Sequence, residues 1–256
     1  MATVRTEDRE DGVRVLTLDR PPANAIAPDL LDELLASLKA AREAAHVRAV
    51  VVTGAGKFFS GGLDLSQTGS EAELAELLLD KYRDSHVELL SFPKPTIGML
   101  NGHAIAGGLI ILLACDVRLG VEGDYKIGLN EVAIGASFPR VAFEIVRLRL
   151  THQSASELLL GAGLYPVSEG LRLGVVDELI PAAKFEETVI RRAAQLGSYP
   201  GEAFAHTKAA LVSEAAERVR AQTAEEAAGD IAAWMTSESL AARAAQAEKL
   251  GKRTKQ

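Results

Sequence analysis

Two glycine-rich segments each lead from a loop into an apolar run that can begin a helix. The first is FFSGGLDL, residues 58–65, and the second is HAIAGGL, residues 103–109. Glycine lets a backbone approach a bound molecule closely, and the first N–H groups of a helix have no partner within it. One such N–H from each segment could stabilise a developing oxyanion. Taken singly, either glycine pair is explained as well by tight packing of a helix on a strand, and neither segment matches a nucleotide-binding loop.

Glu131 is the candidate acid–base group. It lies in YKIGLNEVAIG, residues 125–135, among apolar side chains. A carboxylate in apolar surroundings has a raised pKa, which suits a general base. An isolated glutamate near the end of a strand is more often a surface residue, so the sequence leaves both interpretations open.

Other reactive residue types do not form a recognisable site. The five histidines show no zinc-binding spacing, Ser60 lies outside any G-x-S-x-G pattern, and Cys115 is the single cysteine. We therefore predict no metal site, no serine nucleophile and no internal disulfide, with Cys115 as a small buried hydrophobe. Asp64 and Asp116 each follow an apolar stretch, which favours helix capping or loop fixing.

Composition restricts the class of protein. The 256 residues suffice for one large domain or a domain with an appendage, and 48% of them are hydrophobic, enough for a sizeable core. A net charge of −7 argues against a broad nucleic-acid surface but allows a local basic pocket. The charged N-terminus has no apolar signal core, and the apolar run 104–115 is too short to span a bilayer. We expect a cytoplasmic protein with no membrane partner.

Strand and helix patterns alternate along the first part of the chain. Strands are predicted at 13–20, 47–54, 96–100, 116–120 and 125–129, and helices at 29–45, 71–90 and 106–114. This order predicts the α/β class. From residue 183 to 250 the chain is rich in helix formers and too hydrophilic to form its own core, with Pro200-Gly201 as the main break. We predict a core over 1–195 and a helical region over 196–256 that packs on the core or on a neighbouring subunit.

Five motifs, in order and over nearly the whole chain, resemble the crotonase superfamily, the enoyl-CoA hydratase/isomerase family. RPPANAI at 20–26 is similar to its CoA-adenine loop, FFSGGLDL to its first oxyanion segment and NGHAIAGGLIILLACD at 101–116 to its second. SEGLRLGVVDELIP at 168–181 and the lysine-bearing AHTKAAL at 205–211 also have counterparts there. The resemblance implies a ClpP/crotonase-like ββα spiral core with a helical C-terminal trimerisation region, in a homotrimer or a hexamer made of two trimers.

The resemblance also implies roles for particular residues. The backbone N–H groups of Leu63 and Gly107 would polarise the thioester carbonyl of an acyl-CoA and hold the enolate. Coenzyme A would enter as part of the substrate, with no permanently bound cofactor. Arg20 and Lys208 are the foremost candidates for contacts to its phosphates. The full set of implied substrate-binding residues is Arg20, Ala23, Ala25, Ser60, Gly61, Gly62, Asp64, Leu65, Gly108 and Lys208.

The family's hydratases use two glutamates, and this chain matches only one of them. Ile110 stands at the first position and Glu131 at the second. A single glutamate resembles the mitochondrial-type Δ3,Δ2-enoyl-CoA isomerases, in which one base removes a proton at C2 and returns it at C4. Ile134 and Phe138, with Ile110, would line an apolar pocket around it.

Two other functions stay open. The chain could be an enoyl-CoA hydratase in which another acid replaces the missing glutamate; Asp80, Asp84 and Glu88 are the candidates. It could also be an acyl-CoA-binding protein without catalysis, as the lost first glutamate would allow.

Overall fold

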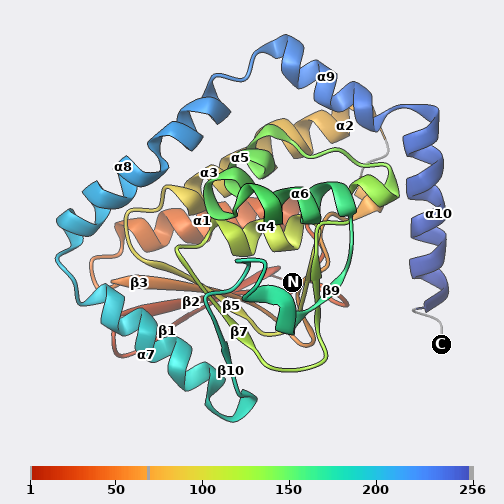
Figure 1. Ribbon diagram of the computed structural model, residues 1–256. Coiled ribbons are helices and arrows are strands. Elements are labelled where there is room, and N and C mark those ends of the chain that lie inside the picture. Colours follow the sequence, from red (N-terminus) through yellow and green to blue (C-terminus); the bar gives the residue numbers. More distant parts are fainter. Residues whose placement is uncertain (1, 68–69, 254–256) are drawn as a thin grey trace.

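The computed structural model describes residues 2–67 and 70–253 and contains a large sheet flanked by helices (Figure 1). The large sheet has the order β1-β2-β3-β5-β7-β10, with β1 antiparallel to β2 and the other neighbours parallel. Val13 is opposite Ala49, and Ile97 is opposite Val117. The strands are β1 (Val4–Asp8), β2 (Val13–Leu18), β3 (Ala49–Gly54), β5 (Thr96–Leu100), β7 (Val117–Val121) and β10 (Glu178–Ile180).

A second sheet has the order β4-β6-β8-β9. Its strands are β4 (Phe58–Ser60), β6 (His103–Ile105), β8 (Lys126–Gly128) and β9 (Tyr165–Pro166). β4, β6 and β8 each come directly after one strand of the large sheet, and a helix or 3-10 turn follows each of them. The chain thus repeats a strand–strand–helix unit, which confirms the predicted ββα spiral of the α/β class. The three turns that follow the short strands are where the site is built.

Helices cover both faces of the large sheet. α7 (Phe185–Gly197) packs on one face, over a core that includes Val13, Val51 and Val189. Val50 and Val52 point to the other face, under the main helical layer, so β3 is buried on both sides as its apolar run predicts. That layer contains α1 (Pro28–Glu43), α3 (Arg83–Leu90), α4 (Gly107–Ala114), α5 (Arg140–Arg149) and α6 (His152–Gly161).

The predicted helix over 71–90 is present but is not uniform. α2 (Glu71–Ala75) leads into the π-helical η2 (Glu76–Tyr82) and then into α3. A π turn contains more residues than an α turn and so rotates the side chains that follow it, and such segments are frequent at functional sites. The 3-10 turns are η1 (Leu65–Gln67), η3 (Val132–Ile134), η4 (Val167–Gly170) and η5 (Ala182–Lys184).

The C-terminal region forms α8 (Gly201–Arg220), α9 (Ala224–Trp234) and α10 (Ser237–Arg253), which run along the top and one side of the molecule in Figure 1. Besides Pro200-Gly201, the chain breaks at Thr223, whose side chain forms a capping box with Glu226. Over the described ranges, the helices are all too short or too polar to cross a membrane.

Asp116 fixes α8 to the sheet by an ion pair with the buried Lys208. The Lys208 ammonium is buried and donates a 2.7 Å hydrogen bond to the Asp116 carboxylate, which also accepts from the backbone and hydroxyl of Thr96. Arg149 lies 3.5 Å from the same carboxylate. The Asp116 carboxylate therefore joins the start of β5 to α8, whereas the sequence pattern favoured helix capping or loop fixing. The prediction that Lys208 binds a CoA phosphate is wrong, because its charge is already used inside the fold.

We expect Lys208→Ala to lower the free energy of unfolding by about 2 kcal/mol or more, because it leaves the partly buried Asp116 carboxylate with only the longer contact to Arg149. Chemical denaturation measures this loss. Lys39→Ala removes an exposed lysine and should cost less than about 0.5 kcal/mol. Equal and small losses in the two variants would contradict a structural role for Lys208.

Candidate active site

One cavity of about 620 Å³ brings together the two glycine-rich segments, the Glu131 turn and the C-terminal helices. Leu63 comes from the first segment and Gly107 from the second, while Trp234 reaches the cavity from the end of α9. The predicted site residues that line it are Ala23, Ala25, Gly61, Leu63, Asp64, Leu65, Gly107, Glu131, Ile134 and Phe138.

Ser60 and Asn24 hold the first segment in place without lining the cavity. The buried Ser60 hydroxyl donates to the Asn24 carbonyl at 2.8 Å and accepts from the Gly62 N–H at 3.2 Å. The Asn24 amide in turn donates to the carbonyls of Ala55 and Phe58. Ser60 is therefore part of the loop framework and does not line the cavity, which contradicts its predicted role in substrate binding.

The two glycine-rich segments contact each other backbone to backbone. A Cβ atom on Gly108 would lie 2.3 Å from the Ser60 carbonyl oxygen, so no other residue fits there without a shift of the backbone. Gly62 has a φ of +88°, and a Cβ on it would lie 2.7 Å from the Ala106 Cβ and 3.3 Å from the Gly107 nitrogen. Neither Gly62 nor Gly108 lines the cavity, so both serve the fit between the segments.

This contact leaves two backbone N–H groups free at the cavity. Leu63 pairs with Ile26 in a parallel bridge, in which Gly62 accepts and Asp64 donates, so the N–H of Leu63 points away from Ile26. Gly107 is the first residue of α4, where an N–H has no partner within the helix. Within residues 2–67 and 70–253, neither N–H forms a hydrogen bond. Both can therefore be offered to a ligand oxygen.

Ala106, directly before Gly107, has a φ of 55° and a ψ of −133°. This left-handed φ is costly for a residue with a Cβ, and such strain is most often found at functional sites. The Ala106 N–H donates to the Gly128 carbonyl at 2.8 Å, which ties the strained residue to β8. The start of α4 is thus held in a fixed direction toward the cavity.

Glu131 is buried, with an exposed fraction of 6%. Burial raises the pKa of its carboxyl group to about 8, and one carboxylate oxygen has no hydrogen-bond partner among the described residues. Its carbonyl accepts from the N–H groups of Ile134 and Ala136, so the residue begins a tight turn. The interpretation of Glu131 as a surface residue is wrong. A buried carboxyl group with a raised pKa is suited to act as a general base.

Tyr82 lines the same cavity and was not predicted. Its ring is 2% exposed, and a Cβ on Gly107 would lie 3.3 Å from the Tyr82 hydroxyl oxygen. Burial raises the pKa of the phenol, and the nearby Glu131 carboxylate raises it further. Tyr82 ends the π-helical segment, and the leucine pattern of residues 71–90 contains no sign of this local change of helix type.

Asp64 lines the cavity but is held in an ion pair. Its carboxylate accepts from the Arg20 guanidinium at 2.8 Å and from the Ser66 hydroxyl at 2.6 Å. Burial opposes ionisation, but these hydrogen bonds prevail and keep the pKa of Asp64 below its usual value. Arg20 does not line the cavity. Its guanidinium is instead held in the ion pair with Asp64.

Ile110 is fully buried in the main core and does not line the cavity, so that part of the predicted pocket is wrong. The apolar wall near Glu131 comes from Ile134, Phe138 and Trp234.

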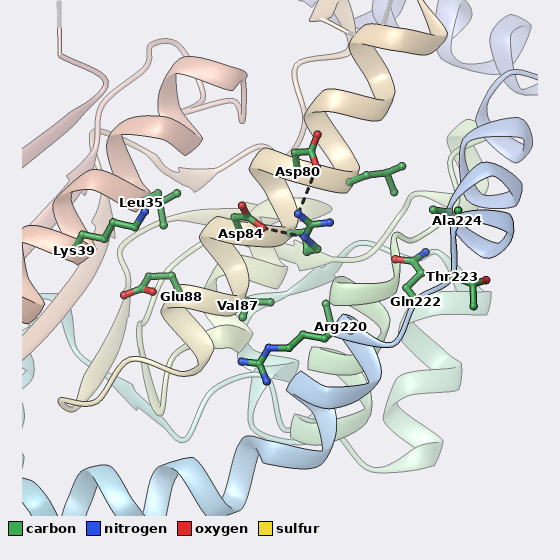
Figure 2. Close-up of a pocket in the computed structure, with 14 residues that line it drawn as sticks. Leu35, Lys39, Asp80, Asp84, Val87, Glu88, Arg220, Gln222, Thr223 and Ala224 are labelled. Atoms are coloured by element: carbon green, nitrogen blue, oxygen red, sulfur yellow. Dashed lines mark hydrogen bonds and ion pairs between the residues drawn. The ribbon is translucent and has the colours of Figure 1, made fainter.

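The acids proposed to replace the missing glutamate lie elsewhere. Asp80, Asp84 and Glu88 line a separate groove between α1, α3 and the link from α8 to α9, and this groove shares no lining residue with the cavity (Figure 2). Arg83 lies 3.4 Å from Asp80 and 2.9 Å from Asp84, while Arg42 pairs with Glu88. The prediction that they act as a second acid is therefore wrong.

No group of three or more histidine, cysteine, aspartate or glutamate side chains in the described parts of the chain could hold a metal ion. Cys115 is buried, and burial raises the pKa of its thiol to about 12. It packs in the main core as a small hydrophobe, as predicted.

The chain is similar in sequence and in fold to known proteins. The enoyl-CoA hydratase/isomerase family model matches residues 8–251. A probable enoyl-CoA hydratase of Bacillus subtilis is 35% identical over 204 residues, covering 78% of this chain and 77% of that protein. Human mitochondrial enoyl-CoA delta isomerase 1 is 29% identical over 226 residues, covering 84% and 72%. The crystal structure of human mitochondrial delta3-delta2-enoyl-CoA isomerase superposes with a TM-score of 0.93 at 26% identity, covering 98% of this chain and 99% of that one.

The raised pKa of Glu131 predicts a pH-dependent cost to stability. Between about pH 5 and 8 the folded protein keeps a proton on Glu131 that the unfolded chain has released, so stability falls as the pH rises. We expect wild type to lose up to about 1.4 kcal/mol per pH unit relative to Glu131→Gln across this window. Denaturation of both proteins at several pH values measures the difference. A difference that stays constant with pH would show that the carboxyl group is not desolvated.

Proposed function

The chain belongs to the enoyl-CoA hydratase/isomerase family, and we propose that within it the protein is a Δ3,Δ2-enoyl-CoA isomerase of fatty-acid metabolism. The observation that carries the proposal is a single buried carboxylate, Glu131, one oxygen of which has no hydrogen-bond partner among the described residues, in a cavity that also offers two free backbone N–H groups. Asp64 is the only other carboxylate among the described lining residues, and Arg20 holds it.

One carboxylate suffices to move a double bond. In 3-enoyl-CoA, the Glu131 carboxylate takes a proton from C2, and the electron pair of that C–H bond moves into the thioester carbonyl. The N–H groups of Leu63 and Gly107 stabilise the resulting dienolate oxygen, and each such donor is typically worth about 3–4 kcal/mol of barrier. The protonated Glu131 then donates at C4, which gives 2-enoyl-CoA.

Hydration makes a different demand. Two acid–base groups must hold a water molecule and transfer protons on both sides of the double bond. Ile110 replaces the first glutamate and lies in the core. Ile134, Phe138 and Trp234 surround the remaining base with apolar surface, which disfavours bound water and raises the pKa of Glu131. These features favour isomerisation.

Hydration of 2-enoyl-CoA is the second candidate function, and the likeness to the Bacillus subtilis relative supports it. In that case Tyr82 would have to take part in holding the water, because it is the polar side chain nearest to Gly107.

Lys126 is our proposed contact for a CoA phosphate. It lines the cavity and is exposed, whereas Arg20 and Lys208 are both held in ion pairs. Ala23, Ala25 and Gly61 line the same cavity and offer close approach to the rest of the cofactor moiety.

We expect purified protein to convert 3-enoyl-CoA to 2-enoyl-CoA, followed by absorbance of the conjugated thioester, and Glu131→Gln to lower kcat by about 10²–10⁴-fold because the base is lost. Glu122→Gln, an exposed acid, should leave the rate unchanged. Since the base must be ionised, kcat/KM should rise with pH about tenfold per unit up to about pH 8 and then level off.

Crotonyl-CoA distinguishes the two functions. An isomerase should leave its absorbance nearly unchanged, whereas rapid loss of that absorbance with slow isomerisation would make the protein a hydratase. Tight binding of acyl-CoA without turnover of either substrate would instead indicate a non-catalytic binding protein.

We also propose a trimer, or two trimers in a hexamer. Leu160 and Leu211 are 76% and 62% exposed in the single chain and would gain from burial against a neighbour. Light scattering coupled to size exclusion should give three or six times the 27.1 kDa of one chain. A mass equal to one chain would exclude the trimer.

A further inference from the structure

Arg243 of α10 is a buried cation, and no carboxylate among the described residues neutralises it. It is 4% exposed, and none of the ion pairs among the described residues includes it. Its guanidinium donates to the Gly135 carbonyl at 2.9 Å and to the Trp234 carbonyl at 2.7 Å, and it lies 4.9 Å from the centre of the Trp234 ring. Burying a charge without an acid beside it costs free energy, so the hydrogen bonds of Arg243 must offset that cost.

Those contacts fix α10 on the turn that carries Glu131. Gly135 closes this turn with a φ of +69°. A Cβ on Gly135 would lie 2.8 Å from the Ser239 Cα and 3.0 Å from the Ala242 Cβ, so the backbone of α10 packs directly on the turn. Arg243 then bonds the carbonyl of the same glycine. The turn and the helix are held at a single point.

The same guanidinium fixes the end of α9. The Trp234 indole is 1% exposed and donates to the Ser137 carbonyl at 3.0 Å, so the ring bridges α9 and the segment after Gly135. Trp234, Gln246 and Ala247 all line the cavity that contains Glu131. α9 and α10 of one chain therefore form part of the wall around the base of that same chain, at the side of the helical layer (Figure 1).

We propose that Arg243 is a positioning residue that locks α10 onto the Glu131–Gly135 turn, so that the C-terminal helices hold the base in place and keep water away from it. The proposal rests on the proposed function, in which Glu131 is the base. Arginine suits this task better than lysine, because its planar fork bonds two carbonyls at once and stacks on an aromatic ring.

Few charged groups near Glu131 could change its pKa independently of α10. Tyr82 from the π-helical segment is the titratable group that interacts with Glu131, and it is neutral at ordinary pH. Asp64, His103 and Lys126 line the same cavity, and Asp64 is paired. Loosening α10 should therefore act on Glu131 mainly by admitting water, which lowers its pKa toward that of an exposed glutamate.

Arg243→Met tests the lock, because it keeps much of the side-chain stem and removes both hydrogen bonds. Trp234 is the single tryptophan of the chain, so its fluorescence reports on the contact without any substrate. We expect acrylamide quenching of Trp234 to increase about twofold or more as the ring becomes accessible, and kcat for 3-enoyl-CoA to fall about tenfold or more through misplacement of the base. The midpoint of the pH profile of kcat/KM should fall by about one pH unit.

Two further variants complete the design. Lys249→Met removes an exposed cation from the same helix and should match wild type in all three measurements. Arg243→Lys keeps the charge without the fork and should give intermediate quenching and an intermediate shift of the midpoint. If Arg243→Met does not fold, Arg243→Lys decides the question.

Quenching and a pH midpoint equal to those of wild type, in whichever of these variants folds, would overturn the proposal. A uniform loss of rate with an unchanged midpoint would also overturn it, since it would indicate only a smaller folded fraction. Failure of the proposed function is distinguishable, because wild type itself would then not isomerise 3-enoyl-CoA. In that event two measurements that need no substrate test the role of Arg243. The first is quenching of Trp234. The second is the pH dependence of stability, compared with and without Glu131→Gln in wild type and in each Arg243 variant; no change in either measurement would overturn the proposal.

Discussion

The close contact between Gly108 and the Ser60 carbonyl is the constraint on which the site depends. Because a side chain at Gly108 would collide with that carbonyl, the start of α4 can rest directly on the turn after β4. The turn itself is held by Ser60, which donates to the Asn24 carbonyl, and by the Asn24 amide, which donates to the carbonyls of Ala55 and Phe58. Two segments more than forty residues apart in the sequence thereby present their free N–H groups to one cavity. Backbone groups held in this way need no reorganisation when charge develops on a ligand.

The carboxylate in the same cavity requires that water be kept away, which the backbone N–H groups do not. N–H donors are compatible with water, whereas a base with a raised pKa depends on its exclusion. The fold meets this by surrounding Glu131 with apolar groups from its own turn and from α9. The desolvation of Glu131 makes the folded state less stable as the pH rises, so reactivity at this position is obtained at the expense of stability. Packing in the rest of the structure must offset this loss of stability.

The sequence predicted the parts of the fold and site that depend on local patterns. The apolar run of β3 and the glycine pairs reflect burial and close approach within short stretches, and those are visible in a single sequence. The buried pair of Lys208 and Asp116 joins residues 92 positions apart, and a lysine on a polar helix shows no sign of it. Tyr82 reaches the cavity through a π-helical segment that an α-helical pattern cannot show. The wall contributed by α9 and α10 depends on how the last helices fold back, which their composition does not specify.

Ile110 occupies the position at which the two candidate reactions make different demands on the fold. In the sequence it takes the place of a hydratase's first glutamate, and in the structure it belongs to the main core, with no access to the cavity. A carboxylate there would need a path to the cavity and a water molecule to act on. An apolar residue instead completes the packing of α4, which carries the Gly107 donor. Through the packing of α4, Ile110 thus supports the N–H group that either reaction would use. Under the isomerase proposal, the two free N–H groups act with a single base, and transfer of a proton from one carbon to another is the chemistry that a single base can complete.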